Sequence, residues 1–521
     1  MSLTHADVPL HEILRATVRS QPNRVAVVFE DQTLTFADLD AESNRLAHGL
    51  RMLGLRPGDR LGLFLPNCPE FEIAFYAASK VGAIACPLNS SYREREVIYQ
   101  LNDSRASILV THSRLWPVVE ASRSQLTYLR DIVVIGNEPP ANVSRYEELL
   151  SGQSAEPPGD QIDPKQLVVL PYSSGTTGLP KGVMLTHRNL VSQHEQYVLA
   201  TEMGPEDSYV IYMPLSHIYG IAIMGVAIRA GAKQILLERF DLETILRLIR
   251  EHAVTWLFGV PPVLLTLANA PGLEPSQFKT VKFIFSAAAP LAPDVARRVE
   301  ARLGVRVIQA YGLTEASPAT HHSPLDYERI KLESGGVLMA DTEHRIVDLE
   351  TGERELPSGK IGEIVVRGPQ VMQGYWNSPK ETSRVLRDGW LFTGDIGWVD
   401  EDGYIFIVDR KKEMIKDKSF SIAPAELEAV VLEQPEVADC CVVGIKDPEA
   451  GEIPKAYVVP RGEGAIDLSA LSNFVAERVA GYKQIRQFEI IQAIPRTPSG
   501  KILRRLLRSN LPRDSARSCI N

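Results

Sequence analysis

The feature that most constrains the fold of this chain is the repeated alternation of short apolar strands with helices. Residues 59–66 have the pattern of a strand, residues 69–83 that of a helix and residues 84–89 that of another short strand. Further strand patterns follow at 106–112, 131–136 and 167–174, and a second series runs through 232–240, 254–259, 282–290 and 305–315. Because βαβ units form parallel sheets covered by helices, the sequence predicts an α/β fold.

The 521 residues are too many for one compact core. Between residues 331 and 408, short alternating segments with turn signals between them predict a small β-rich subdomain. We therefore predict an N-terminal domain, residues 1–409, made of two βα-layered subdomains and this β-rich one. A small α+β C-terminal domain, residues 410–521, follows it.

Composition narrows the class of protein. With 44% hydrophobic and 23% charged residues, the chain resembles a soluble globular enzyme, and its net charge of −9 argues against nucleic-acid binding. Five cysteines without a paired CxxC spacing predict neither a disulfide framework nor a zinc site. No signal peptide and no run of 18 apolar residues is present, so we expect a cytoplasmic protein without a membrane span.

The segment 172–187, YSSGTTGLPKGVMLTH, has the chemistry of a polyphosphate site. It offers hydroxyl donors, glycines that let backbone N–H groups approach a ligand, and one lysine: Ser173, Ser174, Thr176, Thr177, Gly175, Gly178, Gly182 and Lys181. An ordinary polar turn is the alternative, although turns rarely need so many hydroxyls. The segment is not a Walker loop, because Lys181 lies between Pro180 and Gly182.

Further motifs follow in a fixed order: SAAAPL at 286–291, QAYGLTE at 309–315, LFTGD at 391–395, DRKKE at 409–413 and PRTPSGK at 495–501. With these motifs, from about Leu34 to Arg505, the chain resembles the adenylate-forming enzymes. That superfamily includes acyl-CoA synthetases, 4-coumarate:CoA ligases, firefly luciferase and nonribosomal-peptide adenylation domains. The acyl- and aryl-CoA ligase branch is the most similar.

The resemblance implies an ATP site with Mg²⁺. Asp395 would take the ribose hydroxyls, and Thr314 and Glu315 would hold the metal. Lys501, Lys181, His217, Thr176 and Glu315 would be catalytic. The nucleotide-binding residues implied are Ser173, Ser174, Gly175, Thr176, Thr177, Lys181, Ala288, Gln309, Ala310, Tyr311, Thr314, Asp395, Arg410 and Lys501. Taken alone, Glu315 also fits an acid at a helix N-terminus.

The acid-substrate pocket implied by the resemblance contains His217, Tyr219, Ala287 and Ala310. Read without the family, His217 is as readily a packed histidine with a satisfied hydrogen bond. The family usually has glycine where Ala310 stands. Together His217, Tyr219 and Ala310 favour a flat aromatic or cinnamate-like acid over a long alkyl chain.

For the second half of the reaction, the resemblance implies a hinge at Lys412, within 409–412, and an acceptor tunnel for CoA. The tunnel residues implied are Lys416, Lys418, Ser419 and Arg239. A lysine run of this kind is usually a solvated face. The chain also departs from the family here, since Lys418-Ser419-Phe420-Ser421 replaces the usual Lys-Gly-aromatic-Gln, and Ser419 adds a Cβ where glycine would leave room.

Three functions remain open. The first is an AMP-forming acyl- or aryl-CoA ligase that uses a carboxylic acid, ATP and CoA. The second is an adenylating enzyme that transfers to a carrier protein or an amine, or that activates another oxyanion such as nitrite. The third is a non-catalytic binding protein on the same fold. Either a monomer or a homodimer is compatible with the sequence.

Overall fold

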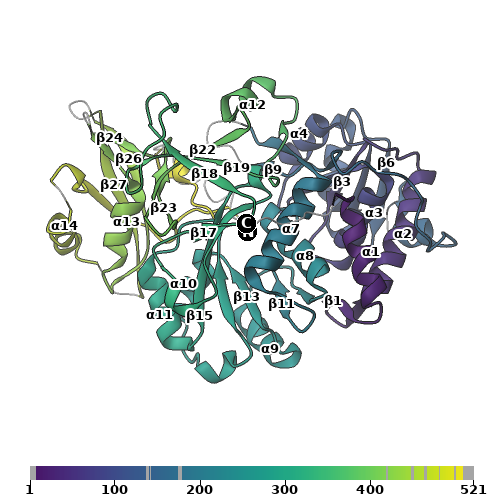
Figure 1. Ribbon diagram of the computed structural model, residues 1–521, viewed down its shortest axis with the longest axis horizontal. Coiled ribbons are helices and arrows are strands. Elements are labelled where there is room, and N and C mark those ends of the chain that lie inside the picture. The colour runs from purple at the N-terminus through teal and green to yellow at the C-terminus, as the bar shows by residue number, and fades with distance from the viewer. Residues whose placement is uncertain are drawn as a thin grey trace.

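The computed structural model describes residues 7–136, 140, 142–173, 179–417, 420–447, 451–462, 466–479, 481–497 and 500–508. Figure 1 shows layered sheets and helices, with the N-terminal helices on one side and the C-terminal elements on the opposite side. Within the described residues, no helix is both long and apolar enough to cross a lipid bilayer.

The first βα series forms a sheet whose central strands are parallel. Its spatial order is β20 (Gly374–Tyr375), β10 (Lys181–Thr186), β8 (Leu167–Val169), β4 (Ile84–Leu88), β3 (Arg60–Phe64), β5 (Ile108–His112), β6 (Asp131–Ile135) and β7 (Ser144–Arg145), with β9 (Tyr172–Ser173) paired to β10. The helices of this part are α3 (Pro69–Val81), α4 (Glu94–Ser104), α5 (Trp116–Ser122) and α6 (Tyr146–Leu150).

The second series forms another largely parallel sheet. Its order is β17 (Val337–Leu338), β16 (Ala319–His322), β15 (Arg306–Gly312), β14 (Phe283–Ser286), β13 (Trp256–Gly259), β11 (Ser208–Ile211), β12 (Lys233–Leu236), β1 (Val25–Phe29) and β2 (Gln32–Thr35). The associated helices are α1 (Leu10–Ser20), α2 (Phe36–Met52), α7 (His187–Thr201), α8 (Ile218–Ala230), α9 (Leu242–His252), α10 (Pro261–Asn269) and α11 (Pro293–Leu303).

Two smaller sheets complete the molecule. The β-rich subdomain contains β18 (Glu343–Val347), β19 (Gly362–Arg367), β21 (Leu386–Arg387), β22 (Trp390–Val399), β23 (Ile405–Arg410) and α12 (Pro379–Val385). The C-terminal part contains β24 (Ile415–Asp417), β25 (Phe420–Ile422), β26 (Val437–Asp447), β27 (Gly451–Pro460), β28 (Gln487–Ile490), α13 (Pro424–Leu432), α14 (Leu468–Ala476) and α15 (Arg504–Arg508).

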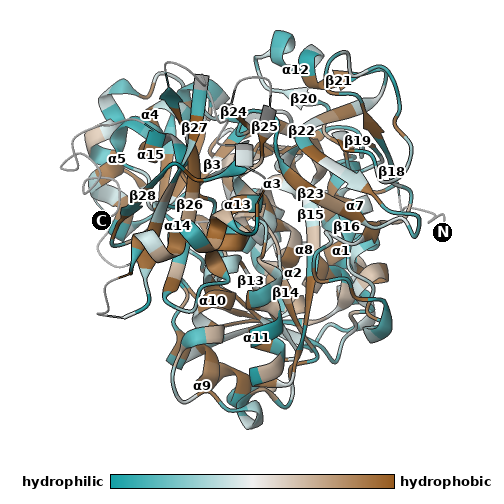
Figure 2. Ribbon diagram, turned by 90° about the vertical axis from the view of Figure 1, so that its left-hand side faces the viewer, coloured by the Kyte–Doolittle hydropathy of each residue, from teal (hydrophilic) through white to brown (hydrophobic). Residues whose placement is uncertain are grey.

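This architecture confirms the predicted fold class. Apolar residues, drawn brown in Figure 2, lie along the strands and the inner sides of the helices, whereas an outer helix such as α12 is polar. The two parallel sheets share one core with fully buried aromatic rings such as Phe258 and Phe285. The C-terminal sheet has its own core, which includes Ile415, Leu427 and Val442. Separate cores are the packing expected of separate folding units.

One long-range feature goes beyond the sequence pattern. The alternation of residues 25–35 predicts only a local hairpin, and β1 and β2 do form one. The structure adds this hairpin to the edge of the second sheet, where Val27 pairs with Gln234 of β12 in parallel. The N-terminal segment is therefore an integral part of the sheet that holds the second βα series.

Candidate active site

The carboxyl ends of β14 and β15 meet the β-rich subdomain at a cluster centred on Asp395. Its carboxylate accepts a hydrogen bond from the Tyr311 hydroxyl at 2.8 Å and one from Arg410 Nε at 2.7 Å. Asp395 and Arg410 are direct cross-strand partners on β22 and β23, and Asp395 is only 6% exposed. The Asp395 carboxylate raises the pKa of the Arg410 guanidinium above its usual range, so the guanidinium stays charged.

Glu315 links this cluster to the segment predicted to bind phosphate. It lies in the short 3₁₀ turn Thr314–Ala316. Its Oε1 accepts from the Tyr375 hydroxyl at 2.7 Å and from Ser173 Oγ at 3.4 Å. The Oε2 atom is not used by either contact. Magnesium usually takes one or two carboxylates and completes its shell with water and phosphate oxygens, so a carboxylate with one engaged oxygen fits the predicted role.

Lys181 begins strand β10, beside this cluster. Its Nζ lies 2.6 Å from Glu381 Oε2 in α12 and 5.2 Å from the centroid of the Tyr375 ring. The lysine lowers the pKa of the Glu381 carboxyl through their hydrogen bond. Lys181, which the sequence predicts to bind phosphate, thus contacts the Glu381 carboxylate and the face of the Tyr375 ring in this structure.

Lys501, from the C-terminal PRTPSGK motif, lies in the same electrostatic environment. Burial lowers its pKa and the positive charge of Arg410 lowers it further, while the carboxylates of Asp395 and Glu315 act in the opposite direction. The preceding Gly500 has φ +82°, and a Cβ there would lie 3.2 Å from the Val260 Cβ. This close approach favours glycine and places the Lys501 loop against the N-terminal part.

His217 and Tyr219 lie at the N-terminus of α8: His217 immediately precedes the helix, and Tyr219 is in its first turn. His217 caps the helix, since its Nδ1 accepts from the Tyr219 backbone N–H at 3.2 Å. Desolvation, and then the charge of Lys501, lower the His217 pKa to about 4, so its imidazole is neutral at physiological pH. The Tyr219 ring is buried, and its hydroxyl donates to the Gly259 carbonyl at 3.3 Å.

The other predicted pocket residues lie at neighbouring strand ends. The Ala287 N–H donates to the Gly259 carbonyl at 3.3 Å. Ala288 is exposed with φ +71°, a left-handed conformation that is strained for a residue with a side chain and is often found at functional sites. In β15, the Gln309 N–H donates to Ser323 Oγ at 3.0 Å, and Ala310 lies opposite His322 of β16.

Several predicted residues are exposed, lie in the C-terminal sheet or fall outside the described residues. Arg239 is exposed in the loop between β12 and α9, and Lys412 is exposed in the turn between β23 and β24. The backbone of Lys416 pairs with Ser421 in the C-terminal sheet. The residues outside the described ranges are Ser174, Gly175, Thr176, Thr177, Lys418 and Ser419.

Two side chains of the cluster were not predicted. Tyr375 joins Glu315 to Lys181, and Glu381 pairs with Lys181. Each contact spans at least 60 residues of sequence, and neither residue stands in a motif whose chemistry would single it out. The GYW sequence around Tyr375 is too short to have identified it.

The arrangement points to a class of protein: an α/β enzyme with a polar cluster at the carboxyl ends of parallel strands, where ligands of such folds bind, and a lysine supplied by the C-terminal part. Residues 14–376 match the model of the AMP-binding enzyme family, and residues 426–501 match that of the AMP-binding enzyme C-terminal domain. The chain belongs to the AMP-binding enzyme family. Like the members it resembles, it is an AMP-forming acid–thiol ligase.

Individual relatives agree with this assignment. The 4-coumarate–CoA ligase 1 of Solanum tuberosum is 37% identical over 521 residues, which cover 97% of this chain and 94% of the relative. The crystal structure of the anthranilate CoA ligase AuaEII with anthranoyl-AMP matches with a TM-score of 0.90 at 26% identity, covering 99% of this chain and 98% of that one. The o-succinylbenzoate coenzyme A synthetase of Bacillus subtilis with ATP and magnesium matches with a TM-score of 0.83 at 29% identity, covering 95% and 99%.

Proposed function

We propose that the protein activates an aromatic or cinnamate-like carboxylic acid with ATP, releasing pyrophosphate, and transfers the acyl group from the acyl-adenylate to CoA. The observation that carries this proposal is the convergence of Lys501 with Arg410, Asp395 and Glu315. These groups come from two domains and combine cations for phosphates with a carboxylate for ribose.

The first step follows from elementary chemistry. A carboxylate is a poor electrophile, and attack of its oxygen on the α-phosphate of ATP converts it into a reactive mixed anhydride. Negative charge on the phosphates is met by Lys501 and Lys181, while Asp395 orients the ribose, so the protein acts by positioning and electrostatics. Magnesium, held by Glu315 with Thr314 beside it, would neutralise further phosphate charge, and a relative's structure contains ATP with this ion.

The acid would lie near His217 and Tyr219, with its carboxylate toward Lys501. A neutral His217, whose Nδ1 accepts from the Tyr219 N–H, can donate a hydrogen bond from its Nε2–H there without repelling Lys501. We propose aromatic walls for this pocket, because the Tyr219 ring centroid lies 6.3 Å from that of Phe285 and 6.5 Å from that of Phe258. Flat walls suit a flat acid, and the names of the coumarate and anthranilate ligases support the same substrate class.

The second step would use a rotation of the C-terminal domain, residues 410–521, relative to residues 1–409 about Lys412. An exposed residue in a turn between two sheets is suited to absorb the change in backbone angles. Lys416, Lys418, Ser419 and Arg239 would then line the path of CoA. We propose a cytoplasmic enzyme, monomeric or homodimeric, with no nucleic-acid partner.

One observation favours a second candidate. Ser419 and Ser421 stand where the resemblance leads us to expect glycine and glutamine. If that difference is functional, the acceptor is a carrier-protein thiol or an amine, or the activated oxyanion is one such as nitrite. A non-catalytic binding protein is the third candidate, and any acid-dependent release of pyrophosphate would exclude it.

Substitution of Lys501 tests the proposed first step. We expect Lys501→Ala to reduce acid-dependent pyrophosphate release by about 100-fold or more, because a phosphate-stabilising charge is lost. Transfer to CoA from a supplied acyl-adenylate should change little, since that step does not need this lysine. Equal loss of both half-reactions would contradict the assigned role, and unchanged thermal unfolding would confirm that the variant is folded.

A further inference from the structure

His322 is a buried histidine on the same side of the sheet as the proposed acid pocket. It lies directly opposite Ala310 in the antiparallel pair of β15 and β16. Side chains of directly opposed residues lie on the same face of a sheet, a few ångströms apart. The neighbouring His321 faces the other way, where its Nε2 lies 2.9 Å from His344 Nδ1.

The His322 ring packs against Phe285, whose ring also contacts Tyr219 at the start of α8. Its centroid lies 5.4 Å from that of Phe285 and 6.3 Å from that of Tyr197 in α7. Phe285 in turn packs against Tyr219, at 6.3 Å. Tyr219, Phe285 and His322 therefore form a continuous series of packed rings that begins two residues after His217.

One ring nitrogen of His322 is buried without a hydrogen-bond partner among the described residues. His322 is 3% exposed, and its Nε2 has no hydrogen-bond partner among the described residues. Burial lowers its pKa to about 4, so the ring is neutral and each ring nitrogen is either a donor or an acceptor. An unpaired buried polar atom destabilises the protein, and a bound ligand that pairs with it removes that cost.

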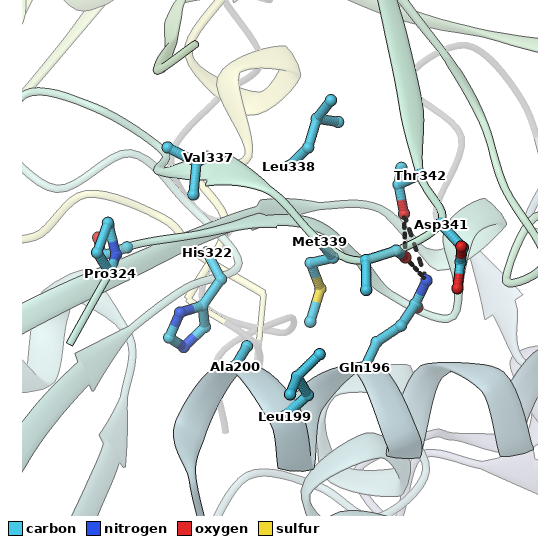
Figure 3. A pocket seen from close by; sticks show the side chains of 12 residues that line it. Gln196, Leu199, Ala200, His322, Pro324, Val337, Leu338, Met339, Asp341 and Thr342 are labelled. Atoms are coloured by element: carbon cyan, nitrogen blue, oxygen red, sulfur yellow. Dashed lines mark hydrogen bonds between the residues drawn. The ribbon is translucent and has the colours of Figure 1, made fainter. Parts of the chain in front are cut away.

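A cavity of about 420 Å³ lies on the outer side of the same residue. Figure 3 shows His322 at its edge, with Leu199 and Ala200 of α7 and with Leu338 and Met339 on the facing segment. The Nε2 atom is shielded from solvent. His322 therefore contacts both the ring of Phe285 and the cavity.

We propose that His322 is a specificity-determining residue that closes the far end of the acid pocket and hydrogen-bonds a neutral hydroxyl or amino group of the substrate. The inference rests on the proposed function, since it assumes that an acid lies along these packed rings. A neutral, buried imidazole cannot compensate a second carboxylate, so dicarboxylic acids are disfavoured. Acids that end in an alkyl group leave Nε2 unpaired, and they are disfavoured for that reason.

The test compares pairs of aromatic acids that differ only by a hydroxyl group at the end distant from the carboxylate. We expect the wild-type protein to favour the hydroxylated member in kcat/KM for pyrophosphate release by about tenfold or more. His322→Leu, similar in volume and unable to hydrogen-bond, should bring this ratio close to one. His322→Gln should restore part of it. His322→Ala should join the pocket to the cavity and increase activity with acids that carry longer end groups.

His321→Leu is the matched control, because it makes the same change at the adjacent residue on the opposite face. It should leave the hydroxyl preference unchanged, whatever it does to stability. If His322→Leu keeps the wild-type ratio while acids are still activated, the inference is wrong and the proposed function stands. If no acid in the panel releases pyrophosphate, the proposed function fails and this inference fails with it. Calorimetric binding of paired non-hydrolysable acyl-adenylate analogues gives the same ratio independently of turnover.

Discussion

At the scale of single residues, the ion pair with Glu381 determines how available Lys181 is for the phosphate-binding role that we propose for it. The two side chains are 29% and 36% exposed, so their ion pair is only partly shielded from water. In the proposed role of Lys181, ATP competes with Glu381 for the lysine. We therefore interpret Glu381 as a carboxylate that holds the lysine until a more highly charged ligand arrives.

Glu381→Ala should lower the KM for ATP by up to about fivefold, because exposed ion pairs contribute roughly 0.2–1 kcal/mol. The measurement is pyrophosphate release at varied ATP concentration with saturating acid. Lys380→Ala, an exposed neighbour in the same helix, is the control and should leave the KM unchanged. An increase in KM for Glu381→Ala would mean that Glu381 supports ATP binding.

The pH dependence of the first step should report on Lys501. Its pKa is lowered by burial and by Arg410. The lysine acts as a cation, so its contribution is complete below its pKa and is lost as the pH rises through it. The alkaline limb of kcat/KM for ATP, which reports the free enzyme, should lie at lower pH than for an ordinary lysine. Lys501→Arg should shift that limb upward, and an unshifted limb would contradict the assignment.

At the scale of elements, a buried ion pair attaches α15 to the C-terminal core. Arg504 and Glu428 are bidentate partners, 13% and 11% exposed, and Arg504 Nη1 also donates to the Val442 carbonyl at 2.8 Å. Because α15 follows Lys501 directly, this pair also anchors the loop that presents the lysine.

Glu428→Ala should destabilise the C-terminal domain by about 3–5 kcal/mol, since it leaves a buried guanidinium unpaired. Thermal unfolding and pyrophosphate release should both report the loss. Glu426→Ala offers a matched control in the same helix, where the Glu426–Lys483 pair is 45% and 22% exposed. That variant should change stability by less than about 1 kcal/mol. Equal effects of the two substitutions would show that burial of the pair is unimportant.

The sequence predicted those parts of the fold and site that depend on local patterns. The alternation of strand and helix patterns predicts the parallel sheets. The motifs that contain Asp395, Arg410 and Glu315 predict residues that the structure brings together. The pairing of β1 with β12 and the contacts of Tyr375, Glu381 and His322 were missed. These depend on tertiary packing between segments far apart in sequence, which periodicity does not record.

At the scale of the whole molecule, the two parts of the chain meet in the arrangement that we propose for the first half-reaction, with Lys501 near Arg410, Asp395 and Glu315. Asp409 Oδ2, at the end of the N-terminal part, accepts from the Ala425 N–H in the first turn of α13 at 3.1 Å. The guanidinium of Arg461, in the C-terminal domain, donates to Asn269 Oδ1 at the end of α10. The second half-reaction would require these contacts to rearrange about Lys412.

Lys412→Pro should restrict that rearrangement, because proline fixes φ near −65°. We expect pyrophosphate release in the first turnover to persist within about threefold, while thioester formation falls by about tenfold or more. Single-turnover assays of the two half-reactions separate these effects. Lys412→Ala, which keeps the hinge free, should retain both. Equal rates of thioester formation in the proline and alanine variants would contradict a hinge at this residue.

The most direct test of the account is pyrophosphate release across aryl, cinnamoyl and fatty acids, each with and without CoA, with mass detection of the products. We predict release with aromatic acids and a CoA thioester as the product. Adenylate that accumulates without thioester would contradict CoA as the acceptor and make the serines at 419 and 421 functional. An absence of release with every carboxylic acid would contradict the central claim that this site activates carboxylates.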